Sequence, residues 1–128
     1  MEKKRVLVID DYPQVVELLK MRLESAGYQV LVAYDGQEGL VKARQEKPDL
    51  IILDIMLPKM NGYKVCRFLK FDKKYRHIPI VMLTSRAKPS DAEIGMKMGA
   101  DEYLFKPYNP KQLLAVVKKY VEKVALSA

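Results

Sequence analysis

The sequence contains one cysteine and one histidine, and this scarcity argues against several kinds of site. Cys66 cannot form a disulfide within its own chain, and a helical, half-buried thiol is the expected state. His77 lies near Pro79 in a basic loop, which favours a solvated side chain over a metal ligand. A site built on thiol or histidine chemistry is therefore not expected.

Long apolar runs are missing as well. None approaches the roughly 20 residues that a bilayer-spanning helix needs, and the start MEKKR leads straight into a predicted strand. We therefore expect a cytoplasmic protein without membrane insertion. Repeats, low-complexity stretches and linkers are also absent, and 128 residues suit one core. The sequence predicts a single domain over residues 1–128, with no visible output domain.

Acidic residues are fewer than basic ones, and the formal net charge is +7. We expect the lysines and arginines to be spread over every predicted helix and mixed with acids. No helix-turn-helix, zinc or aromatic-stacking signature accompanies them, so direct nucleic-acid binding is not expected. A general attraction to acidic partners is the interpretation that remains.

Strand-like and helical patterns alternate five times, which is typical of a doubly wound α/β sheet with helices on both faces. The third and fourth strands are the most apolar and should be central. The first helix is expected to begin near Pro13 and to stop at Gly27. The other helix starts are indicated by Asp35 with Glu38, Asn61, Ser90 with Glu93, and Asn109. The predicted strands cover residues 5–9, 29–33, 50–53, 80–83 and 102–105.

Polar side chains follow four of these strands. Asp10 and Asp11 follow the first, Asp54 the third, Thr84 the fourth and Lys106 the fifth. In a parallel sheet of neighbouring strands these side chains would meet at the carboxyl edge, where open α/β sheets place their sites. Three carboxylates, a hydroxyl and an ammonium form an oxygen-rich pocket, which suits a hard divalent cation and phosphate chemistry.

The cluster of carboxylates needs a positive partner. At ~4 Å, two like charges repel by roughly 4 kcal/mol at an effective dielectric near 20. Lys106 and magnesium are the candidates. Asp54 is a single acid at the end of the most central strand and is the best candidate nucleophile for phosphoryl transfer. Asp10 and Asp11 form a pair that suits a metal. Thr84 and Lys106 can contact phosphoryl oxygens.

In this order, these motifs resemble the receiver domain of two-component response regulators over essentially the whole chain. The segments that carry the resemblance are VLVIDD (6–11), DIMLPKMNG (54–62), LTS (83–85) and GADEYLFKP (99–107). Single-domain chemotaxis-type receivers and transcription-factor receivers are both similar. The resemblance implies a (βα)5 flavodoxin-like three-layer sandwich, with a five-stranded parallel sheet in the order 2-1-3-4-5.

The family also implies a phosphorylation-dependent signalling switch. Asp54 would be the phosphoacceptor, supplied by a sensor histidine kinase or phosphotransfer protein, and Thr84 and Lys106 would contact the phosphoryl group. The chain would catalyse only its own phosphorylation and dephosphorylation, so no other enzyme activity is expected. The implied Mg²⁺ ligands are Asp10, Asp11, Asp54 and the main-chain carbonyl of Met56.

The switch itself would involve Thr84 and Tyr103, whose ring would turn inward as the threonine meets the phosphoryl group. The surface expected to change and to bind a downstream effector is helix four, strand five and helix five. It carries Lys97, Asp101, Lys111, Lys118 and Lys119. A monomer or weak homodimer is expected.

Two residues near the implied phosphoryl group are features of this chain rather than of the family motifs. Met56 and Arg86 flank the path of the hydrolytic water in receivers. Because Met56 has no polar group to orient water, we expect it to slow self-dephosphorylation, while Arg86 would screen the phosphate.

Three other interpretations remain open. A phosphatase with an aspartyl nucleophile would in its best-known family have a second aspartate where Met56 stands. A flavodoxin-like cofactor binder would need a Ser/Thr/Gly-rich loop where residues 10–13 read DDYP. The chain could also be the receiver part of a DNA-binding transcription factor, although residues 112–124 carry lysines where that class typically has arginines for its dimer face.

Overall fold

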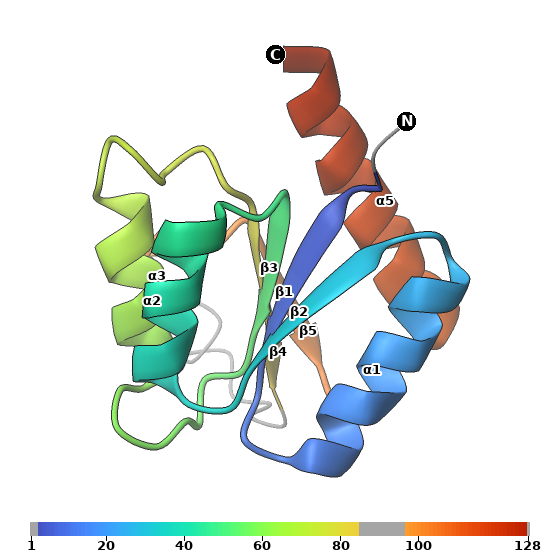
Figure 1. The fold of residues 1–128 in the computed structure, drawn as a ribbon, viewed down its shortest axis with the longest axis horizontal. Helices are drawn as coiled ribbons and strands as arrows, with labels where there is room; N and C mark the ends of the chain where they lie inside the picture. The colour runs from blue at the N-terminus through green and yellow to red at the C-terminus, as the bar shows by residue number, and fades with distance from the viewer. Residues whose placement is uncertain (1–2, 85–96, 128) are drawn as a thin grey trace.

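The predicted apolar runs pair side by side as one parallel sheet in the order β2-β1-β3-β4-β5. Figure 1 shows these strands between the helices. The computed structural model describes residues 3–84 and 97–127, without the side chains of Thr84 and residues 123–127. The strand order confirms the doubly wound flavodoxin-like fold. The strands are β1 (Arg5–Ile9), β2 (Gln29–Ala33), β3 (Leu50–Leu53), β4 (Ile80–Thr84) and β5 (Glu102–Phe105).

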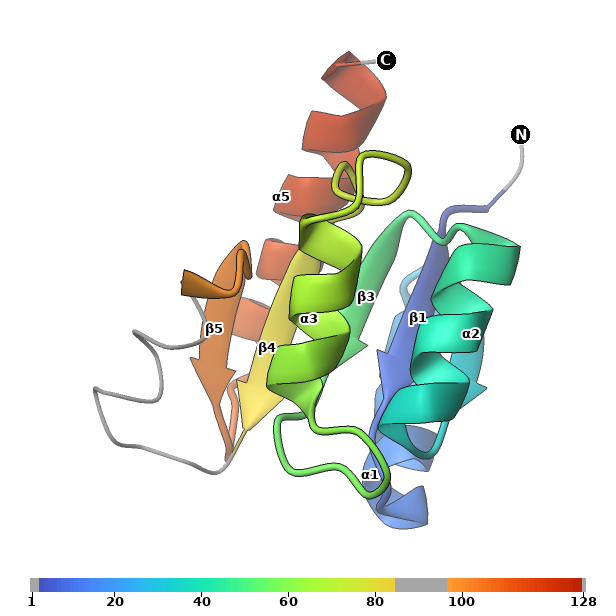
Figure 2. The same ribbon diagram turned by 90° about the vertical axis from the view of Figure 1, so that its left-hand side faces the viewer.

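Helices cover both faces of the sheet and form the two outer layers of a three-layer fold. Figure 2 shows α2 and α3 in front of one face, while α1 and α5 pack on the other face. The predicted fourth helix, with Ser90 and Glu93, lies outside the described residues. The described helices are α1 (Pro13–Ser25), α2 (Gly36–Glu46), α3 (Gly62–Lys70) and α5 (Pro110–Ser127).

The core has two halves because successive strand residues point to opposite faces. In β1, Leu7 and Ile9 pack toward α2 and α3, whereas Val6 and Val8 pack toward α1 and α5. All residues of β3 are buried, which explains why the central strand reads as an unbroken apolar run. This double burial fixes the register of the sheet and therefore where each strand ends.

Short polar side chains begin the helices as predicted. The Asp35 side chain accepts a hydrogen bond from the Glu38 backbone N–H, and Asn61 accepts one from Lys64. Asn109 accepts hydrogen bonds from the backbone N–H groups of Lys111 and Gln112. Each such cap satisfies backbone donors that the first helical turn leaves unpaired. Pro13 begins α1, and Gly27 follows it with a φ of +97°.

A partly buried ion pair ties α3 to the start of β5. The Lys70 ammonium lies 2.7 Å from the Asp101 carboxylate and also donates to the carbonyl of Ile78. Asp101 in turn accepts from the backbone N–H of Ile80 at the start of β4. Because β5 leads directly to Lys106, this network helps to fix the strand that carries the candidate cation.

The two scarce residues differ in their surroundings. Cys66 is fully buried in α3, more deeply than predicted, and burial raises the pKa of its thiol to about 12. His77 is exposed, as predicted. Among the described residues, no helix has the length and apolar character needed to cross a membrane.

Candidate functional site

Three carboxylates meet at the carboxyl edge of the sheet, where the strand arrows of Figure 1 end. One oxygen from each of Asp10, Asp11 and Asp54 lies within 4.8 Å of the other two. Asp10 and Asp54 are only 2% and 5% exposed, and Asp11 is partly buried. The pairing of β1 with β3 brings their carboxyl ends together, because Ile9 and Leu53 are register partners. The predicted acidic cluster is therefore present.

Lys106 supplies the positive charge inside this cluster. Its ammonium lies 2.9 Å from an Asp10 carboxylate oxygen and 3.4 Å from one of Asp54. Lys106 follows β5, so its side chain reaches past the end of β4 to acids that follow β1 and β3. Its predicted role as the counter-charge of the acids is consistent with these distances.

Burial and charge act against each other at these groups. Burial raises the pKa of Asp54 above 3.8 and the charge of Asp10 raises it further, while Lys106 and the Met56 N–H oppose the shift. For Lys106, burial alone would lower the pKa, but its hydrogen bond to Asp10 and the two acidic charges raise it overall. The site thus holds a buried carboxylate whose ionised form is only partly compensated.

Backbone N–H groups orient two of the carboxylates, a feature that our sequence interpretation missed. The N–H of Tyr12 donates to Asp10 over 3.0 Å, and the N–H of Met56 donates to Asp54 over 3.3 Å. Both contacts join an aspartate to the residue two positions later. That is the spacing of an Asx turn, so the aspartates that end β1 and β3 carried a signal for it.

The loop after Asp54 can follow its path only because residue 62 is glycine. A Cβ on Gly62 would lie 2.2 Å from the Asp54 carbonyl oxygen. The Gly62 N–H donates to the carbonyl of Ile55, so α3 begins directly beside the loop. This close approach holds the start of α3 against the residue that carries the candidate nucleophile.

A divalent cation fits the donor set. One carboxylate oxygen of Asp11 is buried and has no hydrogen-bond partner among the described residues. An unpaired buried acceptor is costly, and a hard cation bound by several carboxylates would satisfy it. The side chains that could hold it are Asp10, Asp11 and Asp54. The predicted contribution of the Met56 carbonyl stays a prediction.

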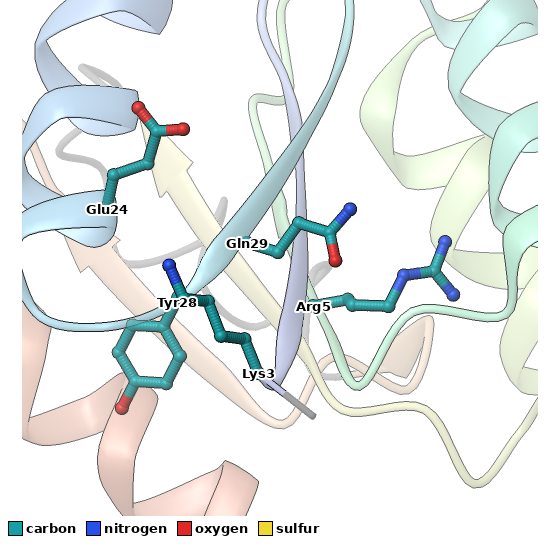
Figure 3. Close-up of a pocket in the computed structure, with 5 residues that line it drawn as sticks. All are labelled: Lys3, Arg5, Glu24, Tyr28 and Gln29. Atoms are coloured by element: carbon teal, nitrogen blue, oxygen red, sulfur yellow. The ribbon is translucent and has the colours of Figure 1, made fainter. Parts of the chain in front are cut away.

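A cavity of about 540 Å³ opens beside Asp11 and Tyr12, and Met56 and Pro58 form part of its wall. A second cavity, of about 590 Å³, is shown in Figure 3. It lies at the amino ends of β1 and β2, at the opposite edge of the sheet, and is lined by Lys3, Arg5, Glu24, Tyr28 and Gln29. Only the first cavity adjoins the carboxylates.

The remaining predicted site residues lie on β4 and β5. Thr84 ends β4 and pairs in register with Phe105, one residue before Lys106, although its side chain is outside the description. The partly buried Tyr103 packs against the core half under α2 and α3, with its ring centroid 5.2 Å from that of Phe105. Arg86 lies outside the described residues. The backbone therefore places Thr84 beside the strand that carries Lys106.

Comparisons with known proteins all point to one family. The response regulator receiver domain matches residues 6–118. The transcriptional regulatory protein PhoP for alkaline phosphatase synthesis in Bacillus subtilis is 44% identical over 125 residues, covering 98% of this chain and 51% of PhoP. The DNA-binding response regulator MtrA of Mycolicibacterium smegmatis is 43% identical over 116 residues, covering 91% and 50%. The chain thus spans about half the length of these relatives.

Solved structures of response regulators are similar to this chain over nearly their whole length. A CheY-like response regulator receiver domain protein from Methanospirillum hungatei has a TM-score of 0.92 at 31% identity, covering 99% of this chain and 100% of that one. The chemotaxis response regulator CheY4 of Vibrio cholerae has a TM-score of 0.86 at 34% identity, covering 93% and 99%.

Replacing the buried acid should stabilise the fold. A carboxyl whose pKa is raised on folding binds its proton more tightly in the folded chain, so stability falls as pH rises from 3.8 through the folded pKa. We expect Asp54→Asn to raise the free energy of unfolding at neutral pH by about 0.5–2 kcal/mol. The gain should disappear in acid, where Asp54 is protonated. Urea unfolding in the presence of chelator measures both values.

The control for this variant is Glu17→Gln, which neutralises an exposed carboxylate on α1. It should change stability by less than about 0.5 kcal/mol. A loss of stability in Asp54→Asn at neutral pH would contradict the interpretation that the site carries uncompensated charge.

Magnesium should stabilise the wild-type chain through the carboxylates. At a free concentration of ~100 times its Kd, the expected gain in unfolding free energy is about 2.7 kcal/mol. Asp11→Ala should lose most of this gain because it removes the oxygen that lacks a partner, whereas Glu17→Gln should keep it. Thermal unfolding with and without Mg²⁺ measures the difference. An equal gain in Asp11→Ala would argue against this donor set.

Proposed function

Because the chain belongs to the response regulator receiver family, we propose that it acts as a switch in which Asp54 accepts a phosphoryl group. The observation that carries the proposal is the Lys106 ammonium placed between two nearly buried carboxylates, 2.9 Å from Asp10 and 3.4 Å from Asp54. An isolated structural ion pair would not need a third carboxylate with an unpaired oxygen beside it. A site that receives a phosphoryl group and a cation would need such a carboxylate.

In the proposed reaction, a carboxylate oxygen of Asp54 attacks the phosphorus of a phosphohistidine on the donor protein. An O–P bond forms as the N–P bond breaks, and the imidazole leaves with the electron pair and takes a proton from solvent. The product is an aspartyl phosphate. Bound Mg²⁺ would supply positive charge to the phosphoryl oxygens.

Lys106 would change partners during this reaction. Before transfer its charge opposes the burial that keeps the pKa of Asp54 high, which favours the ionised and nucleophilic form. After transfer the Asp54 side chain is an acyl phosphate, and the same ammonium can pair with a phosphoryl oxygen while keeping its contact with Asp10. We propose that Thr84 contacts another phosphoryl oxygen and that Tyr103 responds to its movement.

We further propose that the chain catalyses only its own phosphorylation and dephosphorylation. The Met56 side chain is 53% exposed and lies in the wall of the cavity beside Asp11. The N–H of Met56 holds Asp54, but its thioether is only a weak acceptor and orients water poorly. The aspartyl phosphate should therefore be hydrolysed slowly.

Receivers interact with histidine kinases and with downstream effectors. For this chain we propose a sensor histidine kinase or phosphotransfer protein as the donor. The effector surface would include β5 and α5, where Phe105, Lys111, Lys118 and Lys119 are exposed. Phosphorylation can shift this surface only by the free energy with which it favours one conformation over the other.

A second candidate function is that of the receiver half of a transcriptional regulator. Two similar proteins, PhoP and MtrA, are named as a transcriptional regulatory protein and a DNA-binding response regulator, and the chain covers 51% and 50% of them. In that case the phosphorylated surface would control an attached DNA-binding domain. Reading the native frame past the codon of Ala128 distinguishes this candidate from a lone receiver.

Incubation with Mg²⁺ and acetyl phosphate should add one phosphoryl group to the wild-type chain. Asp54→Asn should gain none, and the wild type should gain none in excess chelator. Intact mass measures all three, with Glu17→Gln as a variant that should gain the same group. Absence of a gain in the wild type would overturn the proposed function, and a gain retained in Asp54→Asn would assign the acceptor to another residue.

Replacing Met56 should shorten the life of the aspartyl phosphate. Met56→Asn introduces an amide that can orient the hydrolytic water, so we expect loss of the phosphoryl group to accelerate by about tenfold, which corresponds to 1.36 kcal/mol in the barrier. The decay of the phosphorylated mass after removal of the donor measures the rate. Met21→Asn, on the exposed side of α1, is the matched control. An unchanged lifetime in Met56→Asn would remove the support for this role.

A further inference from the structure

The positive charge of the chain is concentrated in one segment. Residues 59–77 contain seven lysines and arginines against the single acid Asp72, a net +6 of the total +7. Cations do occur in every described helix, as expected, but α1 and α2 balance theirs with an equal number of acids. Six of the seven are exposed, and we call them the basic face: Lys59, Lys64, Arg67, Lys73, Lys74 and Arg76.

The outer side of α3 combines this charge with exposed aromatic rings. Lys64 precedes Arg67 and Phe68 by three and four positions, and the C-cap residue Phe71 follows them by four and three, so the four side chains form a single stripe. Val65, Cys66 and Leu69 fill the opposite side and are fully buried. Phe68 and Phe71 are 49% and 66% exposed, although phenylalanine is usually buried and the opposite side of α3 faces the core. Figure 2 shows α3 on the outside of the sheet.

A hollow of about 410 Å³ lies within this surface. Met60 and Phe68 form its apolar part, and three members of the basic face surround them: Lys59, Lys64 and Arg67. A concave apolar site with charged groups at its rim is the usual form of an anchor pocket for one large side chain. The hollow therefore requires a partner whose shape fits it, in addition to a charge opposite to that of the basic face.

Most of the basic face lacks neutralising partners. Lys59 lies 3.6 Å from the Asp35 carboxylate. The other five cations have no carboxylate within ion-pair distance in the described part of the chain, and the Arg67 guanidinium instead lies 5.8 Å from the centroid of the Phe71 ring. Uncompensated charge of one sign around an apolar hollow creates a field that attracts a partner of opposite sign.

We propose that the basic face binds an acidic protein segment that carries a large apolar side chain, with that side chain filling the hollow at Met60 and Phe68. A phosphate backbone would use the cations but not the hollow, and a lipid surface would favour protruding rings over a concave site. This interaction surface lies on α3 and the loops before and after it, not among the carboxylates. It does not rest on the proposed phosphoryl transfer.

The test is selection of a random peptide library on the full chain, followed by fluorescence anisotropy with the selected peptides. We expect selected peptides with several acids and one aromatic or leucine side chain, and binding that weakens at higher salt. Lys64→Glu combined with Arg67→Glu should lower affinity by at least about tenfold. Phe68→Ser should lower it by a similar factor, as should replacing the apolar residue of the peptide with serine.

The matched control is Lys111→Glu combined with Lys118→Glu, which makes the same charge change on α5, on the other side of the sheet. It should keep affinity within about twofold. Thermal unfolding of each variant checks that it is folded. Three outcomes would overturn the proposal: no enrichment of acidic peptides, an equal loss of affinity in the α5 control, or unchanged affinity in Phe68→Ser. Tighter binding of duplex DNA or phosphatidylserine vesicles that is lost in the α3 double variant would also overturn it.

Discussion

The candidate site depends on one interaction, the contact of the Lys106 ammonium with the carboxylates of Asp10 and Asp54. These acids are almost fully buried, and like charges at this spacing repel strongly in a medium that screens them less than water does. The ammonium offsets part of that repulsion but also has to be desolvated. The resulting balance leaves the pKa of Asp54 raised and one oxygen of Asp11 unpaired. A cation or a phosphoryl group can change such a balance, whereas a fully paired network would resist change.

The fold maintains this contact through devices outside the cluster. Backbone N–H groups of Tyr12 and Met56 orient two of the carboxylates, and Gly62 lets α3 begin against the Asp54 carbonyl. At the other end of the sheet, Lys70 and Asp101 tie α3 to β5. Thus α3 is connected both to the loop of Asp54 and to the strand that leads to Lys106, while its outer side carries Lys64 and Arg67 of the basic face.

The sequence predicted much of this arrangement because its signals are local. The bounds of β1, β2, β3 and β5 agree with the predicted runs, since residues in a covered sheet must be apolar. Asp35, Asn61 and Asn109 cap helices as expected. The three acids and Lys106 could be grouped because parallel strands share a carboxyl edge. The full burial of Cys66 was not predicted, because it depends on which helix side meets the sheet.

The sequence alone determined where the described strands lie, where the described helices begin and which side chains follow the strands, because periodicity and capping act over a few residues. Tertiary structure decided the rest. Lys106 and Asp10 are 96 positions apart, and only packing of β3 and β4 between their strands sets their 2.9 Å contact. The burial that raises the pKa of Asp54 likewise comes from packing. The hollow in the basic face exists because the loop after Asp54 brings Met60 beside α3, and that proximity follows from the folded path of the chain.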